Sequence, residues 1–274
     1  MELFQMCIQS VPESEYSGIV KEAIKIAYEA GEIMLKYFRA KSLESEVKSN
    51  SSDVVTEVDR NVETFVRKAI KDLYPAHGII SEESQPIPSK GDWYWVVDPL
   101  DGTTNFSQGL PVFNISIGIE KNGETVVGVV YAPYLREMFF AVKGCGAFFN
   151  GEQIHVSQKK NLETAVVATG LPYDKKDNPD NNLKEVACVA PEVRGLRRLG
   201  SAALDMAYVA AGFFDAYWEL DLKQWDISAG MLLVREAGGD IFHLRRNRNY
   251  SILACAQTLA SPLLEILLTP TIKS

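Results

Sequence analysis

Cysteine and histidine are scarce in this sequence, and their spacing excludes the sites that most often use them. No two cysteines have the C-x-x-C spacing of a zinc site or a redox motif. We therefore expect reduced thiols in a cytoplasmic protein, at Cys7, Cys145, Cys188 and Cys255. The histidines lie in loop-like or strand-like segments, and no catalytic role is expected for His77, His155 or His243.

Long apolar runs are also missing. None reaches the ~18 residues that a membrane-spanning helix needs. The first residues, MELFQMCIQSVPESE, lack the basic flank and the long apolar stretch of a signal peptide. These absences predict a cytoplasmic protein that does not associate with a membrane.

Positive charge is in deficit. Lysine and arginine number 28 against 36 aspartates and glutamates, which gives a formal net charge of -8. Because a phosphate backbone requires a basic surface, we expect no nucleic-acid partner. A small anionic substrate is still compatible with this charge, since a bound cation or a helix N-terminus can override it locally. The hydrophobic fraction of 46% is typical of a globular chain with a core.

The first half of the chain predicts two helices packed on an antiparallel sheet. Apolar residues at helical spacing predict helices over 14–40 and 53–75, joined by a polar loop at 41–52. Short strands follow within 77–84 and 93–97, and from about residue 111 the apolar period changes to two. Tight hairpin turns are predicted at Asn122-Gly123 and Asn150-Gly151.

The second half alternates strand and helix after a looser polar region. That region covers 157–192 and contains a predicted exposed loop at 174–182. The predicted helices and strands beyond it lie at 201–212, 214–220, 226–239, 251–257 and 260–268. The fold class is therefore α+β or α/β, in one compact unit with halves at 1–153 and 154–274.

The stretch WYWVVDPLDGTTNF, residues 93–106, places two carboxylates at the end of a buried run. Asp98 and Asp101 repel each other unless a positive charge lies between them. Together with the carbonyl oxygen of Leu100 they offer hard oxygen donors, which select Mg²⁺ or Mn²⁺. The backbone N–H groups of Gly102 and Thr103 follow, where they can open a short helix and bind phosphate.

Other acids strengthen this interpretation, although each has a plainer explanation alone. Glu82 and Glu83 end a short strand and can be solvated charges. Asp226 begins a predicted helix and can be a cap, while Asp98 can be a turn former. An EF-hand is excluded, because its D-x-[DN]-x-[DN]-G pattern does not fit DPLDGTTN. Taken together, the acids favour metal chemistry.

The chain resembles the inositol monophosphatase family of Mg²⁺-dependent, lithium-sensitive phosphatases. The family pattern D-P-[IL]-D-G-T-x-N-F appears as DPLDGTTNF, and W-D-x-[AS] with a trailing EAGG appears as WDISAGMLLVREAGG. The patterns E-E, D-x-V-T-x-x-D and G-[ST]-A-A appear as SEES, DVVTEVD at 53–59 and GSAA. These motifs occur in the family order, which makes the resemblance specific. It implies a layered αβαβα sandwich of the sugar-phosphatase type and an inositol-1-monophosphatase type of hydrolase.

The resemblance also implies roles for individual residues. Two or three Mg²⁺ ions, with Mn²⁺ as an alternative, would be held by Glu82, Asp98, the Leu100 carbonyl, Asp101 and Asp226. The catalytic set would be Glu82, Asp59 and Thr103, with Asp59 hydrogen-bonded to Thr103 so that the pair orients and deprotonates the attacking water. The substrate would contact Leu100, Asp101, Gly102, Thr103, Gly200, Ser201, Ala202, Glu219 and Asp226. No covalent intermediate is implied, and a homodimer is the family default.

Rival interpretations concern the chemistry, the substrate and the role. A phosphatase with an aspartate nucleophile uses D-x-D, whereas the acids here are spaced D-x-x-D. Instead of myo-inositol monophosphate, the substrate could be fructose 1,6-bisphosphate or another sugar or nucleotide phosphate. A second phosphate would be held by Arg194, Arg197 and Arg198, which otherwise form a solvated basic edge. Some bacterial relatives act as partners in transcription complexes, so a non-catalytic role is the third alternative.

One segment departs from the family pattern. After EAGGDI, the stretch FHLRRNRNYSILACAQTLASPLLEILL is shorter and more basic than in relatives. This leaves the rim of the substrate pocket, and with it the substrate preference, unassigned by the resemblance.

Overall fold

The computed structural model describes residues 2–39, 45–47 and 54–271 of the chain. Its helices are α1 (Glu2–Gln9), α2 (Ser17–Tyr37), α3 (Glu57–Leu73), α4 (Thr103–Ser107), α5 (Leu183–Val189), α6 (Ala202–Ala210), α7 (Gln224–Glu236) and α8 (Gln257–Leu268). Its strands in the first half are β1 (Ser45–Val47), β2 (Val54–Thr56), β3 (Gly78–Ser81), β4 (Trp93–Asp101), β5 (Asn114–Lys121), β6 (Glu124–Ala132), β7 (Glu137–Val142), β8 (Gly146–Phe149) and β9 (Glu152–Ile154). The remaining strands are β10 (Val166–Thr169), β11 (Gly195–Arg197), β12 (Ala216–Leu222), β13 (Asp240–His243) and β14 (Tyr250–Cys255).

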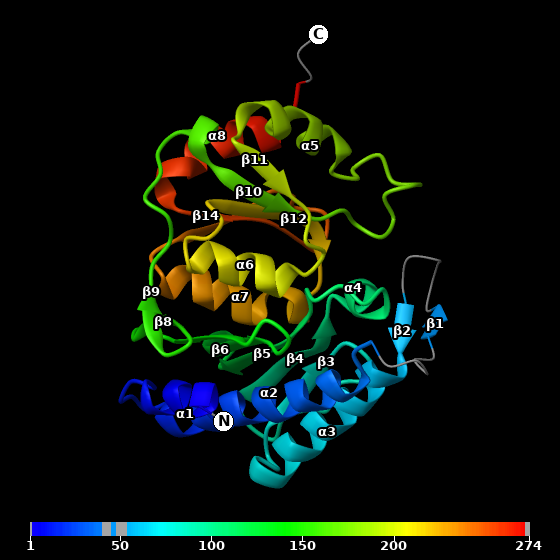
Figure 1. The fold of residues 1–274 in the computed structure, drawn as a ribbon, viewed down its shortest axis with the longest axis vertical. Coiled ribbons are helices and arrows are strands. Elements are labelled where there is room, and N and C mark those ends of the chain that lie inside the picture. The colour runs from blue at the N-terminus through cyan, green and yellow to red at the C-terminus, as the bar shows by residue number, and fades with distance from the viewer. Residues whose placement is uncertain (1, 40–44, 48–53, 272–274) are drawn as a thin grey trace.

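Helices and sheets alternate in layers (Figure 1). Helices α1, α2 and α3 lie on the outer side of a seven-stranded sheet with strand order β3-β4-β5-β6-β7-β8-β9. Helices α6 and α7 lie between this sheet and a five-stranded sheet with order β11-β10-β12-β14-β13. Helices α5 and α8 cover the far side of the second sheet. The predicted αβαβα sandwich is therefore confirmed.

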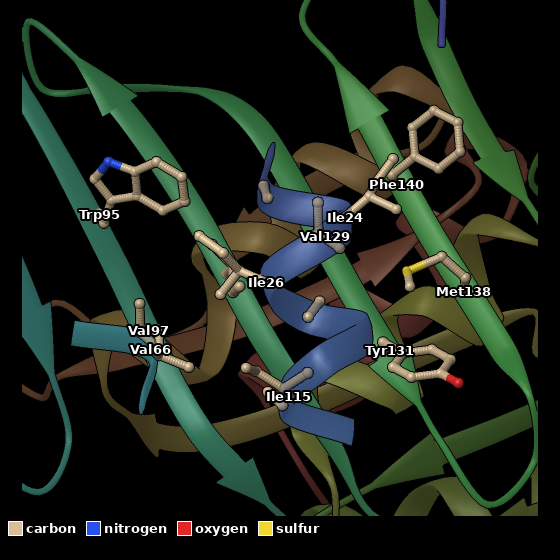
Figure 2. Close-up of a cluster of buried hydrophobic side chains, with 14 of the residues drawn as sticks. Ile24, Ile26, Val66, Trp95, Val97, Ile115, Val129, Tyr131, Met138 and Phe140 are labelled. Carbon is tan, nitrogen blue, oxygen red and sulfur yellow. The ribbon is translucent and has the colours of Figure 1, made fainter. Parts of the chain in front are cut away.

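The packing of α2 follows from its apolar spacing. Ile19, Ala23, Ile26 and Ala30 are all buried, as the helical period predicts. Figure 2 shows how α2 meets the sheet, with side chains from helix and strands at Ile24, Ile26, Trp95, Val97, Ile115 and Val129. The helix ends at Tyr37, inside the predicted range, and residue 40 lies outside the described part of the chain.

The second helix begins later than predicted. Val54–Thr56 forms β2, which pairs antiparallel with β1, and α3 starts only at Glu57. The β-branched run of β2 favours a strand over a helix. The prediction was wrong for residues 54–56, and the loop prediction was wrong at 45–47; the rest of 40–53 lies outside the described residues.

The seven-stranded sheet is antiparallel except at one edge. The predicted turns are confirmed, because Asn122, Gly123, Asn150 and Gly151 all have positive φ, as tight hairpins require. Strand β3, however, pairs parallel with β4, so the prediction of a purely antiparallel sheet was wrong there. The connection between these strands returns the chain along the edge of the sheet before β4 begins.

The polar region of the second half is more ordered than predicted. It contains strand β10 and helix α5, and the loop at 174–182 is not simply exposed. Asn182 is fully buried, and Arg248 forms ion pairs with Asp174 at 3.1 Å and with Asp180 at 3.5 Å. The basic segment that departs from the family pattern therefore holds this loop from a distance of about 70 residues in sequence.

The remaining second-half elements are confirmed with small shifts. The predicted helix at 226–239 is α7, followed by Gly238 with φ of 87°. The last strand and the closing helix are β14 and α8, while β11 and β13 were missed. The proposed division of the chain at residue 153 stays a prediction. Within the described residues, no helix is both long and apolar enough to cross a membrane.

Helix α7 approaches the seven-stranded sheet at a pair of glycines. Gly118 and Gly128 lie opposite each other on β5 and β6. A Cβ atom on Gly118 would lie 2.2 Å from Ser228 Oγ, and one on Gly128 would lie 2.8 Å from the Ala229 carbonyl oxygen. The glycines therefore set the height of α7 above the sheet, and with it the position of the acid in the first turn of α7.

Replacing Gly128 by alanine tests this close approach. The added methyl group meets backbone, which cannot rotate away, so we expect Gly128→Ala to be about 1–3 kcal/mol less stable than the wild type. Chemical denaturation measures the difference, and Gly91→Ala is the matched control, because no atom lies within 4 Å of its Cβ position. Equal stabilities for the two variants would contradict the close packing.

Candidate active site

Strand β4 carries both predicted aspartates, and a bulge separates them. Asp98 pairs with Ser116 and Asp101 with Asn114, so three steps on β4 match two on β5. In a regular strand, residues three apart face opposite sides. The extra residue of the bulge returns Asp101 to the side of Asp98. The strand thus continues past Val97, where the sequence predicted its end, and both carboxylates face one space.

Asp98 is the most deeply placed of these acids. Its side chain is 2% exposed, and its Oδ1 accepts a hydrogen bond of 3.1 Å from the Leu100 backbone N–H. Burial is the main reason why the pKa of Asp98 lies well above its ordinary value. Repulsion from surrounding carboxylates raises this pKa further, and these belong to Glu82, Asp101, Asp226 and Asp59. The predicted acids therefore converge on one point of the fold.

The parallel pairing of β3 explains how Glu82 joins this group. Ser81 lies opposite Val97 in parallel register, so Glu82, which directly follows the end of β3, comes level with Asp98 on β4. Glu82 is exposed, yet its charge acts on both Asp98 and Asp226. The neighbouring Glu83 is not among the main causes of the raised pKa of either aspartate. The parallel pairing of β3 with β4, which was not predicted from the sequence, is thus what brings Glu82 to the site.

Asp101 is held through one of its two oxygens. Oδ2 accepts hydrogen bonds from Asn114 Nδ2 at 3.1 Å, Ser201 Oγ at 2.8 Å and the Ala203 backbone N–H at 2.9 Å. Burial raises the pKa of Asp101, and the hydrogen bonds from Ser201, Asn114 and Ala203 oppose that rise.

Asp226 occupies the first turn of α7 and caps it. Its Oδ2 accepts a 2.7 Å hydrogen bond from the Lys223 backbone N–H, in a capping-box arrangement. Burial again raises its pKa, with further repulsion from Glu82, Asp101 and Glu219. The prediction of a helix cap is therefore correct for Oδ2 of Asp226. The charge of the same residue also raises the pKa of Asp98.

The segment after Asp101 forms the expected short helix. Gly102 has φ of 89° and precedes α4, and a Cβ there would lie 2.8 Å from the Val112 carbonyl oxygen, so glycine is required. Thr103 Oγ1 donates to the Leu100 carbonyl at 2.9 Å. It also lies 3.5 Å from Asp59 Oδ1, the pair that the resemblance implies. Asp59 is buried, at 2% exposure, in the first turn of α3.

The residues expected to meet the alcohol lie beside the acids. Gly200 has φ of 82° and packs against the Arg198 guanidinium, and Ala202 begins α6. Ser201 is only 2% exposed, and its hydroxyl is directed to Asp101. The Ser201 side chain thus orients the Asp101 carboxylate.

Glu219 faces the same space from strand β12. Tyr217 donates a 2.5 Å hydrogen bond to Glu219 Oε2, and the carboxylate packs directly on Gly170. Burial raises the pKa of Glu219 to about 7, against the lowering effects of Tyr217 and Arg198. All three predicted arginines are exposed, and Arg198 is the one whose charge lowers the pKa of Glu219.

Two buried asparagines were missed as site residues. Asn105 Nδ2 donates to the carbonyls of Val112 and Leu199, both at 2.8 Å, and so joins α4 to the chain before Gly200. Asn114 is fully buried and bonded to Asp101. The signal was present, because an asparagine inside an apolar strand is costly unless its amide is satisfied.

The donor set fits a hard divalent cation. Carboxylates and a backbone carbonyl are the ligands that Mg²⁺ and Mn²⁺ prefer, and mutual repulsion among them is relieved by positive charge. His77 accepts a hydrogen bond from Trp95. Among the described residues, no group of three or more acids, histidines or cysteines is arranged, as it stands, to hold a metal ion.

Comparisons with known proteins agree with this fold. The sequence model of the inositol monophosphatase family matches residues 15–269. An inositol-1-monophosphatase of Rhizobium meliloti is 41% identical over 81% of this chain and 84% of its own length. The Nus factor SuhB of Pseudomonas aeruginosa is 43% identical over 79% of this chain and 82% of its own. The crystal structure of extragenic suppressor protein SuhB from Bartonella henselae superposes with a TM-score of 0.87 at 37% identity, covering 93% of this chain and all of that one.

The repulsion at Asp98 has a measurable consequence for stability. In EDTA at pH 8, Asp98→Asn is expected to be more stable than the wild type by at least about 1 kcal/mol, because asparagine can still accept the Leu100 N–H bond without the charge. Because the pKa of Asp98 is raised in the folded state, ionising this side chain lowers the stability of the fold. This destabilisation is absent below the ordinary pKa of 3.8 and grows as the pH rises above it. The advantage should therefore shrink toward pH 5.

Urea denaturation at both pH values measures this difference. The exposed Asp72→Asn is the control and should show no such pH dependence. A wild type more stable than Asp98→Asn at pH 8 in EDTA would contradict the converging charges.

Proposed function

Since the chain belongs to the inositol monophosphatase family, we propose that it is a Mg²⁺-dependent phosphatase of small phosphomonoesters. The favoured substrate is myo-inositol monophosphate, which would be hydrolysed to inositol and phosphate. The observation that carries the proposal is the convergence of Glu82, Asp98, Asp101 and Asp226 from three separate segments, the end of β3, strand β4 and the start of α7.

The aspartates share a pattern that supports metal binding. Each of Asp98, Asp101 and Asp226 uses one carboxylate oxygen to accept a hydrogen bond from an N–H or O–H group of the chain. The other oxygen of each takes no part in these hydrogen bonds. These oxygens, with Glu82 and the Leu100 carbonyl, would hold two Mg²⁺ ions, or three with a weaker site. Bound divalent cations lower the pKa of water and offset phosphoryl charge.

The chain's own residues account for the other requirements. Asp59 and Thr103 would orient the attacking water and take up its proton, with Glu82 beside them. The backbone N–H groups of Gly102 and Thr103 would hold the phosphate oxygens at the start of α4. Attack in line by water requires no covalent enzyme intermediate.

The alcohol would lie between the start of α6 and strand β12. Gly200, Ala202 and Glu219 border this space, and the Glu219 carboxylate can accept hydrogen bonds from substrate hydroxyls. Arg198 lies beside Gly200 and is the one predicted arginine suited to a second phosphate there. This placement favours fructose 1,6-bisphosphate as the alternative substrate.

A second candidate function is suggested by a relative's name. The Pseudomonas aeruginosa relative is called a Nus factor, which supports a role as a partner in a transcription complex. A strain lacking the gene separates the two roles when complemented with wild type or Asp98→Asn. Full rescue by the variant would favour the binding role; loss of rescue favours catalysis.

The family resemblance also predicts the oligomeric state, the response to lithium and the location of the protein. We expect a homodimer, inhibition by lithium and a cytoplasmic location. Size-exclusion chromatography with light scattering, lithium titration and cell fractionation measure these three.

The activity itself is tested by phosphate release from a panel of phosphomonoesters. Wild type should act with Mg²⁺ and stop in EDTA, and Asp101→Asn should lose more than about 100-fold in kcat/KM, since it removes a metal ligand rather than a residue behind one. Asp72→Asn, exposed and distant in the fold, should keep wild-type activity. Hydrolysis that is indifferent to EDTA would refute the metal mechanism.

A further inference from the structure

Asn114 is a polar residue in a place that otherwise favours apolar ones. It opens strand β5, lies directly opposite Asp101, and its side chain has no exposed surface. Its neighbours Phe113 and Ile115 are fully buried core residues. A buried amide is tolerated only when its donors and acceptor are satisfied.

The amide is satisfied on its donor side alone. Nδ2 donates to Ser201 Oγ at 2.7 Å and to Asp101 Oδ2 at 3.1 Å, which uses both of its hydrogens. Oδ1 has no hydrogen-bond partner in the described part of the chain. The reverse orientation would direct Oδ1 at the Asp101 carboxylate, where two acceptors repel each other. The orientation of Asn114 is therefore dictated by Asp101.

Ser201 closes a triangle with these two residues. Its hydroxyl accepts from Asn114 and donates to Asp101 Oδ2, and the Ala203 N–H of α6 donates to the same oxygen. The three donors come from β5 and from the start of α6. Three donors on one oxygen fix the rotation of the carboxylate and leave Oδ1 as the oxygen that these three donors do not hold.

We propose that Asn114 is a positioning residue: with Ser201, it fixes the Asp101 carboxylate so that Oδ2 is held by the protein and Oδ1 is presented as a metal ligand. This inference rests on the proposed function, because it gives Asp101 the ligand role stated there. Asn114 itself touches no metal. Residues that hydrogen-bond to metal ligands typically change metal affinity 10–100-fold when they are replaced.

The test is Mn²⁺ titration of metal-free protein by calorimetry, on wild type and Asn114→Leu. Leucine matches asparagine in size and donates no hydrogen bond. We expect the Mn²⁺ dissociation constant to rise about 10–100-fold. Activity lost at low Mg²⁺ should return at high Mg²⁺, with the substrate KM then near that of wild type. Ser251→Ala is the matched control, since Ser251 is equally buried on a strand of the other sheet and its hydroxyl bonds the Asn249 carbonyl and the Asp221 N–H instead.

A double-mutant cycle separates positioning from a general loss of structure. In the Asp101→Asn background, Asn114→Leu should change the Mn²⁺ dissociation constant less than about twofold, because its target is already removed. Equal losses in both backgrounds, or wild-type affinity in the single variant, would overturn the inference. If Asn114→Leu does not fold, Asn114→Ser, which keeps one donor, must show an intermediate affinity. A wild type that binds no Mn²⁺ would instead refute the proposed function.

Discussion

Repulsion between carboxylates that the fold brings together is the constraint on which the site depends. Asp98 is nearly inaccessible to water, and four other acids raise its pKa. The fold withstands this repulsion because each aspartate is also a structural acceptor: for the bulge of β4, for the start of α6, or for the first turn of α7. The hydrogen bonds that give each aspartate its structural role therefore also orient its carboxylate.

The sequence could predict what is local. Periodicity located α2 and α7, the Asn-Gly pairs located two hairpins, and the motif DPLDGTTNF located the centre of the site. Family resemblance then supplied the order of layers and the identity of the acids. Both kinds of inference depend on residues that are close in sequence or fixed in spacing.

What the sequence could not predict depends on contacts between distant segments. The parallel edge at β3, which delivers Glu82, is set by how the chain returns to β4 and leaves no local signal. Polar residues alternate with apolar ones on β5, which is typical of a strand with one solvent face. Instead, the second half of the chain covers that face, so Asn114 and Ser116 are fully buried and Asn114 acts on the site. The loop at 174–182 was misjudged for the same reason, because its counterions lie in a basic turn far along the chain.

A crystal grown with Mn²⁺ and measured for anomalous scattering tests the central claim most directly. The account predicts anomalous peaks within coordination distance of Asp98, of Asp226 and of Asp101 Oδ1, with Asp101 Oδ2 still bonded to Ser201 and Asn114. Peaks confined to other parts of the surface, or bound through Asp101 Oδ2, would contradict it.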